Sequence, residues 1–96
     1  MSRYTLHEIC EIVGIDEAFA SELVRESILV ADADGDRADR YSVLMLERAR
    51  VARELVSELD VNLAGAAVIL RLREEVVELR RGLGALAREL ERLRGA

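Results

Sequence analysis

The stretch TLHEICEIVGIDEAF, residues 5–19, holds two helix starts separated by one helix end. Thr5 and Glu8 have the spacing of a capping box, in which each side chain accepts a hydrogen bond from the other residue's backbone amide. Gly14 stops the helix that begins there, because glycine adopts the left-handed backbone conformation at little cost. The stretch therefore predicts a first helix between Thr5 and Gly14. Its inner face is expected to consist of Leu6, Ile9, Cys10 and Val13.

A second helix follows with almost no linker. We expect Asp16 to cap it, since an aspartate at this position accepts a hydrogen bond from a free backbone N–H group, and the helix should reach about Ser27. The two helices are joined only by Gly14 and Ile15, which is typical of a helix-turn-helix. The inward side chains of the second helix are expected to be Phe19, Ala20 and Leu23.

Beyond the second helix the pattern changes to that of a small wing. Residues 28–30 (ILV) are apolar and rich in β-branched side chains and predict a short strand, with residues 40–41 (RY) as its return. The nine residues between them, 31–39, hold four aspartates and one glycine. We therefore expect a polar hairpin, the wing, over about residues 28–41.

Two longer helices complete the chain. Ser42 is expected to cap a third helix that runs to about Leu59. Asp60 and Asn62 then end one helix and begin the next, so that residues 63–93 are predicted to form one continuous helix.

The last helix carries eight apolar residues separated alternately by three and four positions, the a and d spacing of a heptad repeat. Such a long, narrow stripe extends beyond what a domain of this size can cover. It therefore predicts a coiled coil, most simply a homodimer with the same helix of a second copy. The residues of this stripe, called the seam below, are Ile69, Leu72, Val76, Leu79, Leu83, Leu86, Leu90 and Leu93.

Charges beside the seam favour parallel pairing of the two helices. A parallel pair sets Glu75 against Arg80, and an exposed pair of this kind contributes about 0.3–0.5 kcal/mol, whereas antiparallel pairing brings like charges together. Gly82 and Gly84 each cost about 1 kcal/mol of helix propensity. They predict a close helix crossing, a kink, or a hairpin in which the last turn folds back.

Length and composition set the class of protein. The 96 residues suit one small domain followed by one long element. We expect a mainly α-helical fold, with a winged helix-turn-helix domain over residues 1–60 and a dimerisation helix over residues 61–96. Membrane contact is not expected, because no apolar run approaches the roughly 18 residues of a membrane span and the N-terminus lacks the apolar core of a signal peptide. A single cysteine fits the cytoplasm.

Negative charge is concentrated in the first half of the chain. Residues 1–41 carry four arginines and ten acidic residues, a net charge of −6, whereas residues 42–96 carry ten arginines and nine acidic residues, a net charge of +1. Because carboxylates repel phosphates, the exposed side of the second helix predicts a basic protein partner better than it predicts the DNA major groove. This side, called the acidic face below, comprises Asp16, Glu17, Ser21, Glu22, Arg25 and Glu26.

Residues with catalytic or metal-binding chemistry are few. His7 and Cys10 lie three apart and offer two ligands, whereas zinc takes four, or three plus water. Asp32, Asp34 and Asp36 alternate like the first ligands of an EF-hand, but the glycine and glutamate that should follow are missing, so a solvated turn is the better interpretation. With one histidine and no phosphate-binding loop or nucleophile motif, we expect no enzyme, no metal and no cofactor.

The order of these motifs resembles the MerR-like winged-helix superfamily. Residues 13–15 (VGI) form the turn, residues 40–42 (RYS) follow the wing, and a longer helix precedes a terminal coiled coil. Residues 60–72 (DVNLAGAAVILRL) look like the start of the last helix in both HspR-type heat-shock repressors and CbpM-type chaperone modulators. The second helix separates the two groups. It lacks the Thr-Leu-Arg-x-Tyr-Glu pattern of DNA-binding members, and residues 14–17 (GIDE) and the aliphatic residues after them are similar to CbpM.

The resemblance to CbpM implies a protein that binds the J-domain of a DnaJ-like co-chaperone and restrains its action on Hsp70. An acidic surface suits the basic helix that J-domains expose. The MerR-like resemblance also implies antiparallel pairing of the last helix, against the charges beside the seam, so the orientation stays open. A second interpretation is an HspR-type regulator that binds operator DNA as a dimer. A third is an assembly factor whose seam binds a helix of another protein. Phosphate contacts in the second interpretation would come from Arg3, Arg25, Arg37 and Arg40.

Overall fold

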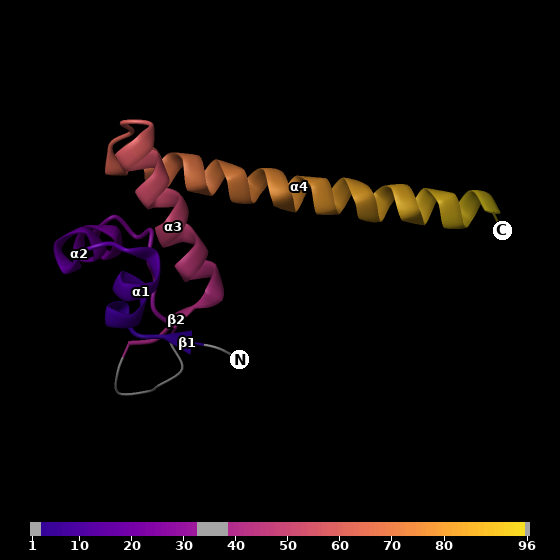
Figure 1. The fold of residues 1–96 in the computed structure, drawn as a ribbon. Coiled ribbons are helices and arrows are strands. Elements are labelled where there is room, and N and C mark those ends of the chain that lie inside the picture. Colours follow the sequence, from indigo (N-terminus) through magenta and orange to yellow (C-terminus); the bar gives the residue numbers. More distant parts are fainter. Residues whose placement is uncertain (1–2, 33–38, 96) are drawn as a thin grey trace.

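A long helix projects from a group of shorter elements in the computed structural model, which describes residues 3–32 and 39–95 (Figure 1). We call the shorter elements, from β1 to α3, the head. Among the described residues the elements are, in chain order, β1 (Arg3–Tyr4), α1 (Leu6–Val13), α2 (Glu17–Arg25), β2 (Tyr41–Ser42), α3 (Val43–Glu58) and α4 (Leu63–Gly95). The prediction of a mainly helical protein with a small sheet is therefore confirmed.

The predicted signals at the start of the chain build α1 and α2. The Thr5 amide donates to Glu8 Oε1 at 2.8 Å and the Glu8 amide donates to Thr5 Oγ1 at 3.1 Å, which completes the capping box. Gly14 follows α1 with a φ of 80°, in the left-handed region. Asp16 Oδ1 accepts a hydrogen bond from the Phe19 amide at 2.8 Å and caps α2. The helix-turn-helix is thus fixed by bonds between near neighbours in the sequence.

The strand predicted over residues 28–30 is wrong. Ser27 adopts a left-handed φ of 60° and ends α2 earlier than expected. The backbone N–H groups of Ile28 and Leu29 then donate to the Leu23 carbonyl, at 2.9 and 3.2 Å, so they close the helix end and pair with no strand. The side chains of Ile28 and Leu29 are 3% and 2% exposed. Their apolar character reflects burial in the core of the head and not strand formation.

The strand β2 forms, but its partner is the N-terminal strand. Tyr4 in β1 lies opposite Tyr41 in an antiparallel pair. The Asp32 amide donates to the Arg40 carbonyl at 2.8 Å, which joins the two ends of the predicted wing. The turn of the wing, residues 33–38, lies outside the described residues.

The core lies between α1, α2 and α3, and the first turns of α4 add to it. Ile9, Leu23 and Leu29 are its largest fully buried side chains. From α4 it receives Ala66 and Leu70. Burial of apolar surface contributes roughly 25 cal/mol per Å², so this cluster is the main source of stability in the head.

The junction between α3 and α4 forms where the sequence predicts it. At the other end of α3, Ser42 lies at the N-cap position, but the predicted capping hydrogen bond does not form. After α3, Asp60 adopts a left-handed φ of 57°, and Asn62 Oδ1 then accepts from the Gly65 amide at 2.7 Å to start α4. Two of the three alternatives predicted from Gly82 and Gly84, a kink and a hairpin, do not occur. The helix α4 runs unbroken through both residues (Figure 1). No helix in the described parts of the chain is long and apolar enough to cross a membrane.

Candidate protein-binding surfaces

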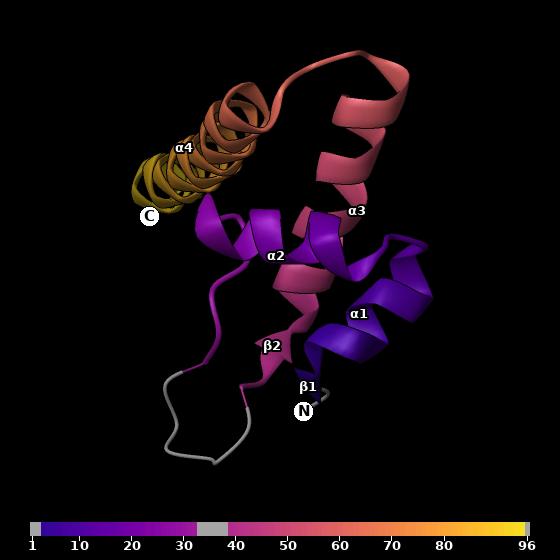
Figure 2. The same ribbon diagram turned by 90° about the vertical axis from the view of Figure 1, so that its left-hand side faces the viewer.

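The acidic face lies on the outside of the helix-turn-helix. Its six residues are all exposed, whereas Ala20 and Leu23 on the opposite side of α2 are fully buried. Figure 2 shows α2 crossing in front of α3, with one side open to the solvent. Burial of the apolar side is what turns the carboxylates outward, so the structure brings the predicted partner-binding residues together on one accessible surface.

The first helix extends this negative surface. His7 on α1 lies 3.5 Å from a carboxylate oxygen of Glu11 and 3.8 Å from one of Glu17 on α2. The starts of α1 and α2 are therefore close in space. Within the described residues, no ion pair neutralises Glu22 or Glu26. The surface thus keeps a strong negative charge over two helices.

An apolar side chain lies on each helix of this surface. Ile12 on α1 is 59% exposed and Val24 on α2 is 39% exposed. Neither residue was predicted from the sequence to belong to an exposed binding surface. Ile12 could have been found, because it falls outside the helical spacing of the inward residues of α1. Exposed aliphatic groups beside carboxylates offer a partner both apolar contact and charge.

The arginines considered for phosphate contact do not change this picture. Arg3 is engaged with Asp32, at 3.3 Å between Nε and Oδ2. Arg25 is exposed and is the single arginine of the acidic face, whereas Arg40 is half-buried. Arg37 lies outside the described residues. The exposed side of α2, which would enter a DNA groove in a helix-turn-helix protein, therefore offers one cation among four carboxylates.

The seam is a second candidate surface, on α4. Its first residue, Ile69, packs partly against the core, and the other seven are between 43% and 68% exposed. The stripe runs along the part of α4 that extends away from the head (Figure 1). A row of exposed leucines of this length is typical of an unfilled helix-packing surface.

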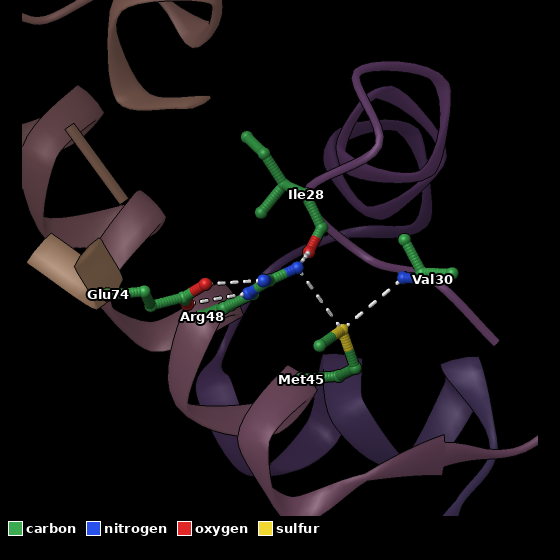
Figure 3. A network of polar contacts seen from close by, with 5 residues as sticks. All are labelled: Ile28, Val30, Met45, Arg48 and Glu74. Carbon is green, nitrogen blue, oxygen red and sulfur yellow. Dashed lines mark hydrogen bonds and ion pairs between the residues drawn. The ribbon is translucent and has the colours of Figure 1, made fainter. Parts of the chain in front are cut away.

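A polar network at the base of α4 was not predicted. Arg48 on α3 donates two hydrogen bonds to the Glu74 carboxylate, from Nε at 2.8 Å and from Nη2 at 2.5 Å (Figure 3). The hydrogen bonds from Arg48 lower the pKa of Glu74, against the opposite effect of burial. The two residues are 26 positions apart, so no local pattern in the sequence signals the pair.

The residues considered as metal ligands have other contacts. Cys10 is buried, and its Sγ lies 3.8 Å from the Asp16 carbonyl oxygen. Burial is the largest cause that raises the pKa of the Cys10 thiol, and the negative charges of Glu17 and Asp16 raise it further. Within residues 3–32 and 39–95 no three His, Cys, Asp or Glu side chains form a group able to hold a metal ion. Asp34 and Asp36 lie outside these ranges.

Comparison with known proteins supports the helix-turn-helix fold. The model of one family, described as MerR HTH family regulatory protein, matches residues 4–94. The match covers the head and nearly all of α4, and it confirms the predicted MerR-like fold. A search of curated proteins gave no match.

Proposed function

Because the chain belongs to the MerR HTH family of regulatory proteins, we propose that it regulates another protein by binding it through the acidic face, without catalysis. One observation carries this proposal. The exposed side of α2 presents Asp16, Glu17, Glu22 and Glu26 with Arg25 as its one cation, and His7 of α1 contacts both Glu17 and the exposed Glu11. Such a surface repels nucleic acid and attracts a basic protein surface.

The partner we propose is the J-domain of a DnaJ-like co-chaperone, whose action on Hsp70 the protein would restrain. The support is the resemblance of the second helix to the CbpM pattern, together with the charge of the acidic face. A basic helix laid against α1 and α2 would meet carboxylates at several positions, with Ile12 and Val24 offering apolar contact. The protein would act as a dimer joined along the seam.

A binding assay with a purified J-domain tests this proposal. The variant carries Glu17→Lys, Glu22→Lys and Glu26→Lys, and we expect its affinity to fall roughly tenfold or more, because three attractive contacts become repulsive. The matched control reverses three exposed glutamates elsewhere, Glu58, Glu78 and Glu91, and so makes the same change in net charge. Equal affinity of the variant and the control would contradict the proposal.

A second candidate function is operator binding as an HspR-type regulator. The family description and the exposed position of α2 in the helix-turn-helix favour it. Titration of stress-gene promoter DNA at several salt concentrations separates the two functions. Specific binding at physiological salt with a steep salt dependence would support DNA binding, and it would remove the main argument for the chaperone modulator.

A further inference from the structure

Among the described residues, burial of α4 against the head is confined to its first turns. Ala66 and Leu70 are its buried residues, and Glu74 is the last described residue of α4 that forms a hydrogen bond to the head. From there to Gly95 the helix extends roughly 30 Å, at about 1.5 Å per residue. A rotation of only about 10° at the base would move the tip by roughly 5 Å over such a length. The contacts near Glu74 therefore decide where the rest of α4 lies.

Arg48 joins three segments at this base. Its guanidinium forms a bidentate ion pair with the Glu74 carboxylate of α4, and its Nη1 donates to the Ile28 carbonyl at 3.2 Å (Figure 3). Ile28 lies three residues after α2 and its amide bonds to the Leu23 carbonyl, so one side chain of α3 contacts both α4 and the segment that closes the second helix. The planar guanidinium fixes the direction of both bonds, which a flexible point charge would not do.

The packing around this pair is incomplete. Two hollows, of about 300 and 430 Å³, flank it, and Arg48, Leu70 and Glu74 line both. The second hollow lies between α3 and α4, where Leu44 and Val77 remain about half exposed. With open space on both sides, apolar packing alone leaves α4 room to tilt. The pair adds a directional contact to the apolar packing of Ala66 and Leu70, at a point with open space on both sides.

We propose that Arg48 is a positioning residue, which fixes the direction in which α4 leaves the head through Glu74 and the Ile28 carbonyl. In a dimer joined along the seam, this direction would set the separation and orientation of the two acidic faces. That consequence rests on the proposed function. The direction of α4 can be measured within one chain. An experiment can therefore disprove the role of Arg48 without disproving the proposed function.

Distance measurement by double electron–electron resonance tests the proposal. Spin labels attached through non-canonical residues at Ala18 on α2 and Arg88 on α4 leave Cys10 untouched, and dilution with excess unlabelled protein restricts the signal to distances within one chain. The test variants are Arg48→Met and Glu74→Gln. Glu78→Gln is the control, since Glu78 lies one turn further along α4 and has no hydrogen bond or ion pair within the described ranges.

We expect one narrow distance maximum for the parent and for the control. In both test variants the distance distribution should broaden and lose its single maximum. Arg48→Lys keeps the charge but not the two parallel hydrogen bonds, so its distribution should have an intermediate width. Circular dichroism establishes that each variant is folded, and Glu74→Gln carries the test alone if Arg48→Met unfolds the head. A distance distribution in Glu74→Gln that is as narrow as in the parent, with the same maximum, would overturn the proposal.

Discussion

The head and the distal part of α4, residues 75–95, share a composition rich in leucine, alanine, arginine and glutamate, but they use their apolar residues differently. In the head many of these side chains are buried in one core, although Ile12 and Leu44 stay exposed, whereas no side chain of residues 75–95 is buried. Most of the stability of a helix in a protein comes from packing of its apolar face, and the distal part of α4 has no such packing within one chain. The same residue types therefore build a packed core in one region, which Ala66 and Leu70 of α4 complete, and an unfilled surface in the other.

The seam provides the largest test of this difference. The double substitution Leu79→Asp, Leu86→Asp should abolish the proposed dimer, because each leucine loses about 1.5–3 kcal/mol of burial against the partner helix. Sedimentation equilibrium should then give half the parent mass. The control is Val77→Asp, an exposed apolar position outside the seam. If the double variant keeps the mass of a dimeric parent, the seam is not the interface.

A core substitution should affect the head whether or not the seam is occupied. Leu23 is fully buried, and Leu23→Ala should lower the free energy of unfolding by about 2–5 kcal/mol, since it removes apolar contacts and leaves a cavity. Urea denaturation at two protein concentrations measures this loss, which should be the same at both. A loss below about 1 kcal/mol would mean that the site collapses to fill the cavity, or that Leu23 is less well packed than the structure indicates.

One type of substitution should have opposite signs in the two regions. Gly14 has a φ of 80°, so Gly14→Ala forces a side chain into the left-handed region and should cost about 1–2 kcal/mol. Gly82 lies inside α4 with nothing near its Cβ position, and Gly82→Ala should gain about 0.5–1 kcal/mol of helix stability. Thermal unfolding followed by circular dichroism measures both. A loss on Gly82→Ala would instead indicate that Gly82 lies at a close crossing of two helices.

Sequence reasoning succeeded where the structure depends on near neighbours. The capping box at Thr5, the turn at Gly14 and the N-cap at Asp16 each involve residues three or four positions apart, so their spacing contains the geometry. The prediction of a strand at residues 28–30 failed for a related reason. An apolar triplet has the same appearance whether it forms a strand or fills a core, and only the contacts of the folded head distinguish the two.

Some features of the candidate surfaces were likewise predictable from the local sequence, and others were not. The exposed position of the acidic face and of the distal seam follows from helix periodicity and was predictable. The closeness of α1 to Glu17 and the pair between Arg48 and Glu74 were not, because they join segments whose relative placement depends on the whole fold. Strand β1 was also missed, since two residues are too short to show an alternating pattern.

The smallest expected effect lies at the joint between the two regions. Hydrogen bonds from Arg48 hold the pKa of Glu74 below its usual value of 4.5. A carboxyl group whose pKa is lowered in the folded state stabilises that state above the pKa of the unfolded chain, and this contribution is lost as the pH falls through the folded pKa. The thermal midpoint of the parent should therefore fall more steeply on acidification than that of Glu74→Gln. The difference should be small, because solvent reaches the pair and screens it.

Other carboxyl groups titrate in the same range, which makes the comparison with Glu74→Gln necessary. The pKa of Glu8 is lowered by the backbone hydrogen bond from Thr5, and that of Glu47 by the side-chain hydrogen bonds that Arg50 donates to it. Both are present in the parent and in the variant, so their effects cancel in the difference between the two curves. Two parallel curves of midpoint against pH would mean that the joint contributes nothing measurable to stability, and that any role of Arg48 lies in the direction of α4 alone.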